Sequence, residues 1–493
     1  MKSIQSFGCS TVLAGLLCGT TAFADVTASE VWEQWKGFQQ GLGHTIDAGS
    51  EAMEGDTLVV KNITTGFDDG TRQTEGEIDE IRLQQLGDGT VRVTMSEEAR
   101  LAIINRPAIG AKLEIAAVAR QTGLELLISG TPEDMAINAT LPELRLNVDE
   151  LSAQGTKAPF AMQITLKENT GLFHRAAGSG LQIDGDITSK SVSFSATGAD
   201  PDNGGTVTLN GSTTGLAGKI AMEAPSAGKI VDMSQELRNG LRFGGNLTYQ
   251  NGKTHIETDG GDGVYTADSS SEAGALHFDM SADGIRYGGQ GSNSKLALAG
   301  QSMPLPIELA IGETVFDLAL PVMKSEEASP ANLLIKLVDV SVSDTLWAMF
   351  DPETKLPHDP ATLIIDLSGA VRPLVDLFAE DASATKEPFE VAEAKLNQLQ
   401  LKLMGAELAG TGTASVDYSK AEPKPQGLVE LTLSGANQLM TTLTEMGLLQ
   451  AEQAMGARMM LGMFAVPAGE DRMTTKLEFR EDGGIYANGQ RIQ

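Results

Sequence analysis

The amino-acid sequence predicts a mainly β protein, a β-rich α+β fold in which a long twisted antiparallel meander carries an N-terminal helix and C-terminal helices packed on one face. From about residue 57, apolar and polar residues alternate in many short segments, as in strands with one buried face. Twelve Asn-Gly or Asp-Gly dipeptides occur, mostly between these segments, where they favour two-residue hairpin turns. The 55 glycines and the aromatic content of 5% fit many strands and turns better than a helical bundle.

Residues 1–24 have the features of a secretory signal peptide. Lys2 supplies a short basic region, residues 11–19 form an apolar stretch, and Ala22-Phe23-Ala24 gives the small-x-small pattern of a cleavage site. Cleavage after Ala24 predicts an exported, periplasmic protein.

Both cysteines of the chain, Cys9 and Cys18, lie inside the predicted signal peptide. The mature chain is therefore expected to contain no disulfide, no thiolate metal site and no cysteine nucleophile. A lipoprotein signal at Cys18 is the less favoured alternative, because Leu16 and Leu17 precede it where a small residue is usual.

The chain is strongly acidic. Its formal net charge is −30, and loss of Lys2 with the signal peptide makes it −31. Such a surface repels nucleic acid and anionic lipid headgroups, so no nucleic-acid partner is expected. No segment after the signal has the roughly 18 uncharged apolar residues of a transmembrane helix; the nearest, 448–466, contains Glu452 and Arg458.

A helix is expected at the start of the mature chain. Thr27 and Glu30 form a T-x-x-E capping box, and apolar residues follow at helical spacing on one face: Val31, Trp35, Phe38 and Leu42. A partner or a membrane is conceivable for this face, but docking on the protein's own sheet is the favoured interpretation.

The region 25–320 then reads as the antiparallel meander. A short helix over 229–238, ending at Asn239-Gly240, interrupts it. The predicted strands include 57–64, 76–86, 90–95, 123–129, 160–167, 190–198, 206–211, 245–250, 254–259 and 294–300.

A turn-rich passage, PVMKSEEASPANLL, separates the meander from a mixed C-terminal part, 321–493, which continues the sheet. Its predicted strands are 333–342, 361–368, 396–416, 427–434 and 473–480. A short helix that holds Leu346, Trp347 and Phe350 should stop at Asp351-Pro352, because a residue before proline disfavours helical geometry. Further helices are expected near 371–380 and over 436–446 and 448–464.

The segment HFDMSADGIRYGG, 277–289, contains several ionisable residues, but the alternation of side chains between the two faces of a strand accounts for their positions. Phe278, Met280 and Ala282 share one face of a strand, and His277, Asp279 and Ser281 share the other. A type I′ turn at Asp283-Gly284 predicts Ser281 opposite Arg286 and Met280 opposite Tyr287, which leaves Arg286 diagonal to Asp279. The segment is thus interpreted as a hairpin with a solvated polar face.

Four segments resemble an uncharacterised bacterial envelope family, domain of unknown function 2125. They are DVTASEVWEQW at 25–35, LWAMFDPETKLPHDPATLIIDLSG at 346–369, MGLLQAEQAMGARMMLGMFAVP at 446–467 and YANGQRIQ at 486–493. His358 and Gln450 depart from the family pattern. The positions that follow it are Trp347, Asp351, Pro352, Leu356, Pro357, Asp359, Pro360, Asp366, Gln453, Met455, Gly456, Arg458 and Met459.

The resemblance implies an envelope protein but no reaction, because the family has no established activity. At the level of fold, its meander is similar to exported bacterial proteins whose sheets form hydrophobic grooves that handle lipid.

No nucleophile elbow, P-loop, dinucleotide fingerprint or H-E-x-x-H motif occurs, and the five histidines lack metal-ligand spacing, so no catalytic, cofactor or metal residues are predicted. The segments DPDNGG, 200–205, and DGGDG, 259–263, place oxygen ligands of the kind that calcium prefers in tight turns, but ordinary turn chemistry explains both. A hydrolase with paired carboxylates is the third-ranked alternative.

Seven of the 19 methionines fall within 440–473, and Met455, Met459 and Met463 form a helical stripe. This stripe is interpreted as the buried face of a helix on the sheet; the alternative is an apolar ligand lining. The expected function is a non-enzymatic structural or interaction role in the envelope, with lipid or envelope proteins as partners. The alternative is a carrier of lipid or another apolar ligand in a β groove.

Overall fold

The computed structural model describes residues 26–41, 43–106, 112–177, 180–199, 204–225, 232–260, 263–379, 385, 387–419 and 422–493. The predicted signal peptide, most of the segment 200–205 and part of 259–263 lie outside these residues. All 25 described strands belong to one antiparallel sheet. The five described helices are α1 (Ala28–Gly41), α2 (Met233–Arg238), α3 (Asp344–Phe350), α4 (Ala436–Glu445) and α5 (Ala451–Phe464).

The strands are β1 (Thr45–Glu54), β2 (Thr57–Asp68), β3 (Arg72–Gln85), β4 (Val91–Met95), β5 (Glu98–Asn105), β6 (Leu113–Thr122), β7 (Glu125–Thr131), β8 (Asp134–Ala153), β9 (Thr156–Ala158), β10 (Phe160–Ala177), β11 (Leu181–Ala199), β12 (Thr206–Ala224), β13 (Arg242–Gly260), β14 (Gly263–Ser281), β15 (Gly284–Gly300), β16 (Ile307–Leu320), β17 (Ser329–Val342), β18 (Ala361–Pro373), β19 (Phe389–Leu403), β20 (Ala406–Val416), β21 (Pro425–Ser434), β22 (Val466–Gly469), β23 (Arg472–Phe479), β24 (Ile485–Ala487) and β25 (Gln490–Arg491).

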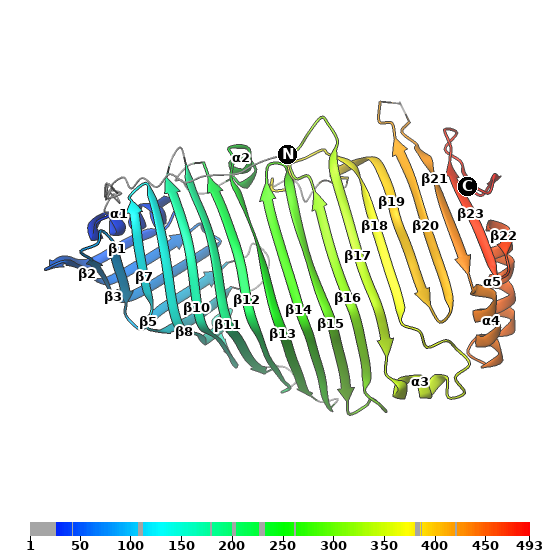
Figure 1. Ribbon diagram of the computed structural model, residues 1–493, viewed down its shortest axis with the longest axis horizontal. Helices are drawn as coiled ribbons and strands as arrows, with labels where there is room; N and C mark the ends of the chain where they lie inside the picture. Colours follow the sequence, from blue (N-terminus) through cyan, green and yellow to red (C-terminus); the bar gives the residue numbers. More distant parts are fainter. Residues whose placement is uncertain are drawn as a thin grey trace, which may run out of the picture.

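The predicted architecture is confirmed: one long antiparallel sheet carries an N-terminal helix and C-terminal helices (Figure 1). From β10 to β21 each strand pairs with the next strand in sequence. The pairing of β16 with β17 carries the sheet into the C-terminal part without a break. The sheet is therefore a meander whose long axis crosses the strands.

The central strands are about twice as long as predicted. Asn210-Gly211 and Asn251-Gly252 were expected to mark turns, but they lie inside β12 and β13. Asn251 adopts a left-handed backbone with φ of 51°. Because Gln250 and Gly252 both keep their partners on β14, the chain continues in the same direction instead of reversing. The dipeptides at Asp88, Asp283 and Asp482 do lie at turns between strands, as predicted.

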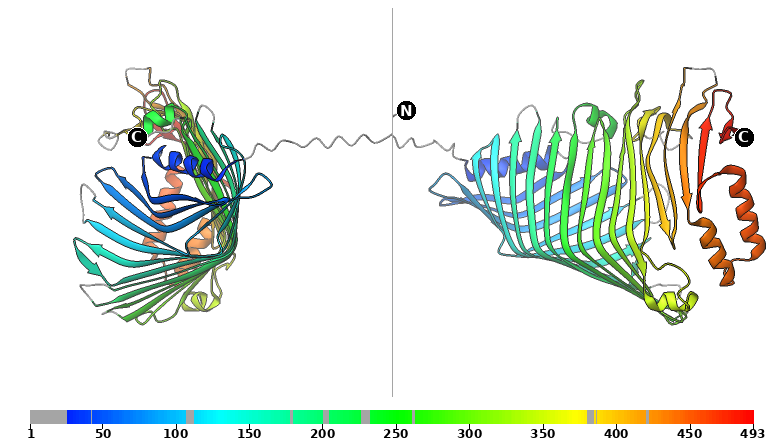
Figure 2. Two further views of the ribbon diagram at one scale, coloured as in Figure 1. Left: turned by 90° about the vertical axis from the view of Figure 1, so that its left-hand side faces the viewer. Right: turned by 45° about the vertical axis from the view of Figure 1, so that its right-hand side comes forward.

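Left-handed residues line up across the sheet and bend it. Besides Asn251, they are Glu168, Gly215, Asn293 and Asp339 in β10, β12, β15 and β17, and Asn62 in β2. Asparagine and glycine adopt this conformation at low cost. Figure 2 shows the result: the strands curve together, and the sheet has a concave side along its length.

The N-terminal core forms where α1 packs on this concave side (Figure 2). The capping box is present, because Glu30 N–H donates to Thr27 Oγ1 at 3.2 Å and Thr27 N–H donates to Glu30 Oε2 at 2.8 Å. Trp32 is almost fully buried, whereas Trp35 is only partly buried, so the buried face differs slightly from the predicted one. The helix packs against an apolar cluster that includes Val60, Ile81, Leu83, Val91 and Ile128.

The C-terminal elements agree with prediction in their extents, except near residues 371–380. Helix α3 ends at Phe350, directly before Asp351-Pro352, and α4 and α5 form the expected pair at the C-terminal end of the sheet (Figure 1). The helix predicted near 371–380 is wrong: residues 371–373 are the end of β18 and residues 374–379 form turns and bends, because the chain leaves β18 through Pro373 and must reverse toward β19. Within the described residues, none of the helices has the length and apolar character needed to cross a bilayer.

Candidate apolar ligand face

The two faces of the sheet differ in polarity along its whole length. We call the face that packs against α1 the inner face and the opposite one the outer face. Direct cross-strand pairing places one residue from each of 17 strands in a single row on the inner face, and every member is apolar, aromatic or glycine. In spatial order the row is Val91, Ile128, Ile137, Phe173, Gly185, Ile220, Gly245, Phe278, Tyr287, Leu318, Leu333, Leu367, Leu396, Gly412, Val429, Leu477 and Ala487.

The neighbouring row on the outer face is polar or small in most of its members, with Leu428 as the aliphatic exception. It consists of Ala136, His174, Asp184, Ala221, Gly244, Asp279, Arg286, Ala319, Asn332, Ser368, Lys395, Thr413, Leu428, Glu478 and Tyr486. Side chains alternate between faces along a strand, so this contrast follows from the period-two pattern of the sequence.

Much of the inner face has no cover from the described helices. Helix α1 covers its N-terminal end, and α2 packs near Phe243, Phe278 and Met280. Five large inner-face side chains nevertheless expose 38–48% of their surface: Val207, Ile220, Ile256, Leu276 and Tyr287. A contiguous exposed apolar surface of this kind is typical of a binding site.

Glycines beside aromatic residues keep the inner face shallow. The ring of Tyr249 occupies the space above both Gly274, its cross-strand partner, and Gly252, where a Cβ would collide with it. The ring of Phe194 covers Gly211 in the same way. Tyr249 and Gly252 share the inner face although they are three residues apart, because the bend at Asn251 interrupts the alternation. The large rings thus lie along the sheet instead of projecting from it.

At the bend, the inner face holds a cavity of about 490 Å³. That volume lies in the range of ligand sites. Apolar side chains from four strands contribute to it, namely Phe194, Tyr249, Leu296 and Ile311, together with hydroxyls such as Thr254 and Ser269. The walls are therefore suited to an apolar molecule with a few polar contacts.

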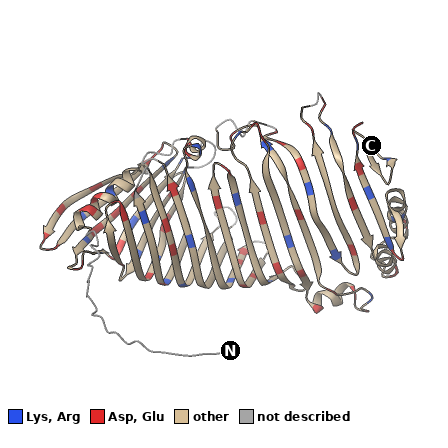
Figure 3. Ribbon diagram, turned by 45° about the horizontal axis from the view of Figure 1, so that its top comes forward, with Lys and Arg blue, Asp and Glu red and all other residues tan. Residues whose placement is uncertain are grey.

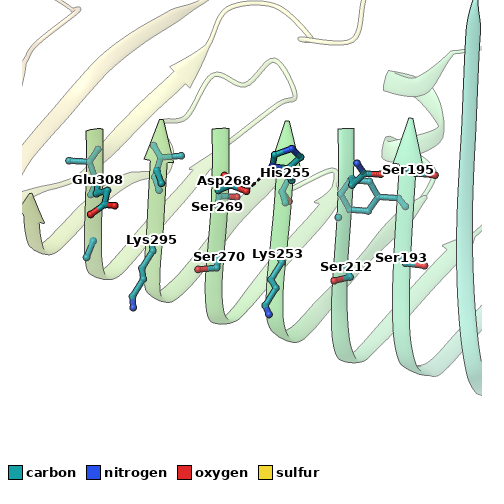
Figure 4. A pocket seen from close by; sticks show the side chains of 18 of the residues that line it. Ser193, Ser195, Ser212, Lys253, His255, Asp268, Ser269, Ser270, Lys295 and Glu308 are labelled. Atoms are coloured by element: carbon teal, nitrogen blue, oxygen red, sulfur yellow. Dashed lines mark hydrogen bonds and ion pairs between the residues drawn. The ribbon is translucent and has the colours of Figure 1, made fainter. Parts of the chain in front are cut away.

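A larger cavity of about 1010 Å³ is lined mostly by outer-face residues (Figure 4). His255 Nδ1 lies 2.7 Å from Asp268 Oδ1 on the neighbouring strand, and Lys253, Lys295 and several serines complete the polar lining. This arrangement brings a histidine and a carboxylate together in a concave site, which sequence reasoning did not predict, because the pairing of β13 with β14 creates it. Among the described residues, no hydroxyl is hydrogen-bonded to His255.

Three of the other described histidines also have carboxylate partners. His174 Nε2 lies 2.6 Å from Asp134 Oδ1, and His277 Nε2 lies 3.0 Å from Asp317 Oδ1. His358 contacts Asp351, and His44 instead packs beside a phenyl ring. Within the described part of the chain, no group of three or more His, Cys, Asp or Glu side chains has the arrangement of a metal site.

The segment 277–289 forms the predicted hairpin, with a shifted register. Ser281 pairs with Gly284, so Ala282 and Asp283 form the two-residue loop, and Arg286 lies directly opposite Asp279. The predicted partners, Arg286 for Ser281 and Tyr287 for Met280, are therefore wrong, because the turn begins one residue earlier than expected.

The polar side chains of this hairpin converge on a third strand. Asp317 accepts hydrogen bonds from Arg286 Nε at 3.1 Å and Nη2 at 3.0 Å, and it contacts His277. The hydrogen bonds and charge of Arg286, helped by His277, outweigh the effect of burial and lower the pKa of Asp317. The cluster is thus an ion-pair network on the outer face.

A buried carboxylate organises the loop after α3. Asp351 accepts hydrogen bonds from the N–H groups of Lys355 and Leu356, both at 2.8 Å, and from His358 Nε2 at 3.1 Å. His358 also stacks on Trp347, with ring centroids 3.9 Å apart. Burial acts to raise the pKa of Asp351, but these hydrogen bonds outweigh it, and the pKa lies below its ordinary value. These contacts stabilise the loop and leave no free group for chemistry.

Residues 268–492 match the profile of a family described as an uncharacterized protein conserved in bacteria, DUF2125. This matched part, the DUF2125 region, is a little less than half of the 493-residue chain. The DUF2125 region contains the three C-terminal segments that carried the resemblance, and it leaves out the segment 25–35. Comparison with curated proteins finds no match to the chain.

Within the DUF2125 region, the methionine stripe is not buried. Met455, Met459 and Met463 expose 68%, 67% and 58% of their surface, so their interpretation as the buried face of a helix on the sheet is wrong. Helix α5 packs against α4 at the end of the sheet rather than upon a face, and Ala454 is its one buried residue. The three methionines also line none of the cavities described above.

Proposed function

We propose that the protein is an exported envelope protein that carries elongated apolar molecules, such as lipid acyl chains, along its inner face without catalysis. The observation that supports this proposal is the uninterrupted apolar row. With neighbouring strands ~4.8 Å apart, the row is roughly 75 Å long. Its exposed side chains would gain by burial against an acyl chain at about 25 cal/mol per Å². The outer face keeps the loaded protein soluble, because its row carries charged and polar side chains such as Asp184, Asp279, Arg286 and Lys395.

A structural or interaction role in the envelope is the second candidate. It is favoured by the exposed methionines of α5, which lie outside the inner face. The two candidates differ in what covers the inner face: lipid for the carrier, and protein or nothing for the structural role.

The carrier function is tested by titrating the purified, delipidated protein with a fluorescent C18 fatty acid. The variant Ile256→Glu/Leu276→Glu places two charges on the inner face at side chains that are 38% and 45% exposed. We expect saturable binding by the original protein and at least a tenfold weaker affinity in this variant, because one unpaired charge in an apolar site costs more than 1.4 kcal/mol.

The matched control is Leu172→Glu/Val264→Glu, which alters two apolar residues of the outer face that are 59% and 39% exposed. This variant should bind as the original protein does. Equal affinities for all three proteins, with circular dichroism confirming that each is folded, would reject binding at the inner face.

Export is tested independently by cell fractionation and N-terminal sequencing. The protein in the periplasmic fraction of its own host should begin at Asp25. A cytoplasmic protein that begins at Met1 would contradict export and leave the fatty-acid titration unaffected.

A further inference from the structure

We propose that α5 docks the C-terminal end of the molecule on a lipid bilayer, with its methionines inserted among the acyl chains. The purpose of this contact rests on the proposed carrier function, since a carrier must receive or release its cargo at a membrane. The docking surface consists of seven residues of α5 and its flanks, all between 38% and 68% exposed: Leu448, Met455, Met459, Met460, Met463, Phe464 and Val466.

The helix is already formed and oriented for this contact. Gln450 and Gln453 build a capping box at its start, and Gln450 N–H donates to Gln453 Oε1 at 3.2 Å. Arg458 is turned toward α4, where its Nη2 donates to Thr441 Oγ1 at 2.7 Å. Arg458 is therefore occupied by α4, Glu452 lies in the first turn on the methionine side, and docking requires no folding step.

The low net charge of this end favours binding to a bilayer through burial of apolar side chains. Residues 436–464 contain only Glu445, Glu452 and Arg458, so their net charge is 1 − 2 = −1, within a chain of −30. Figure 3 shows α4 and α5 as nearly free of charged residues compared with the strands. An acidic protein is repelled by anionic headgroups, and this end is where that repulsion is weak. Methionine and phenylalanine are suited to shallow insertion at the interface.

The size of the surface argues against a second copy of the chain as the occupant. A helix of 14 residues is roughly 21 Å long and 10 Å wide, or about 200 Å² in projection. A stable protein interface needs about 800 Å² on each partner, and two such acidic chains repel each other. A bilayer accepts a single inserted helix.

The position of α5 connects docking to the inner face. Helix α4 contacts β20, and the last members of the apolar row, Val429, Leu477 and Ala487, lie nearby on β21, β23 and β24. An α5 inserted in a leaflet therefore brings the C-terminal end of the row to the membrane surface.

The test is co-flotation of the full protein with vesicles of phosphatidylethanolamine and phosphatidylglycerol in a 3:1 ratio, at 50 and 500 mM NaCl. We expect binding that changes less than twofold with salt. The variant Met455→Gln/Met459→Gln/Met463→Gln removes apolar surface without adding charge, and it should bind at least tenfold more weakly. The control Met53→Gln/Met349→Gln changes two methionines that are each 56% exposed elsewhere, and it should bind normally.

Three results would overturn the proposal: no flotation of the original protein, unchanged flotation of the triple variant, or a dimer in native mass spectrometry that the triple variant abolishes. The fatty-acid titration separates this proposal from the carrier function. Normal flotation without fatty-acid binding would retain docking and reject the carrier, whereas normal titration without flotation would do the reverse.

Discussion

Asp317 shows how three strands combine to stabilise one charge. Its carboxylate accepts hydrogen bonds from Nε and Nη2 of Arg286 and lies within hydrogen-bonding distance of His277, and its side chain is only 16% exposed. The alternation of polar and apolar residues predicted that His277 and Arg286 belong to the polar side of the hairpin. Their common partner, Asp317, could not be predicted, because it lies on the next strand and depends on a register that the sequence does not encode locally.

We expect Asp317→Asn to lower the free energy of unfolding by about 1.5–3 kcal/mol at pH 7, the range for hydrogen bonds to charged groups. The folded-state pKa of Asp317 lies below its unfolded value of 3.8. Its contribution is therefore complete above about pH 4 and is lost as the pH falls through the lower folded value. Urea unfolding between pH 7 and 3 should show the variant converging on the original protein.

The exposed turn residue Asp283 supplies the control, and Asp283→Asn should change stability by less than ~0.5 kcal/mol. A constant difference between Asp317→Asn and the original protein down to pH 3 would show that Asp317 contributes by packing and not by charge.

At the scale of elements, the left-handed residues decide whether a segment is a hairpin or a bent strand. Asn251-Gly252 predicted a reversal, and the structure has one residue of positive φ inside a 19-residue strand. Both outcomes use the same conformational freedom of asparagine. The difference is whether the residues on either side find partners on the next strand, which is a property of the whole sheet.

We expect Asn251→Val to destabilise the protein by roughly 1–2 kcal/mol, because a β-branched side chain opposes the left-handed backbone. Asn251→Gly should stay within a few tenths of the original stability. Asn246→Val, at an ordinary exposed position of the same strand, is the matched control and should be nearly neutral. Equal thermal shifts for the two valine variants would show that the bend tolerates any residue.

The fold was largely predictable from sequence at this scale, and the site was not. Three signals each depend on only a few neighbouring residues: the two-residue alternation of the strands, the capping box at Thr27 and the helix end before Asp351-Pro352. The elements could therefore be located from the sequence. The burial of Met455 and Met459 depended on whether α5 lies on the sheet or beyond its end, and helical spacing is the same in both cases.

At the scale of the whole molecule, the apolar row is much longer than a single ligand. The acyl layer of one leaflet is about 15 Å thick, half of the ~30 Å hydrocarbon core. We therefore predict that the inner face binds more than one C18 fatty acid per chain. Native mass spectrometry of the saturated protein should show complexes with two or more ligands, and a strict limit of one would restrict binding to the cavity at the bend.

The meander order of the sheet also determines how the molecule can assemble. From β11 to β21 every strand pairs with the strand that precedes it in sequence, so each new pairing closes only a short loop. Contacts of this kind resemble those of repeat proteins, in which structure propagates from neighbour to neighbour. The sheet can therefore grow one strand at a time from whichever part of the chain is available first, and every added strand lengthens the apolar face by one residue in the row.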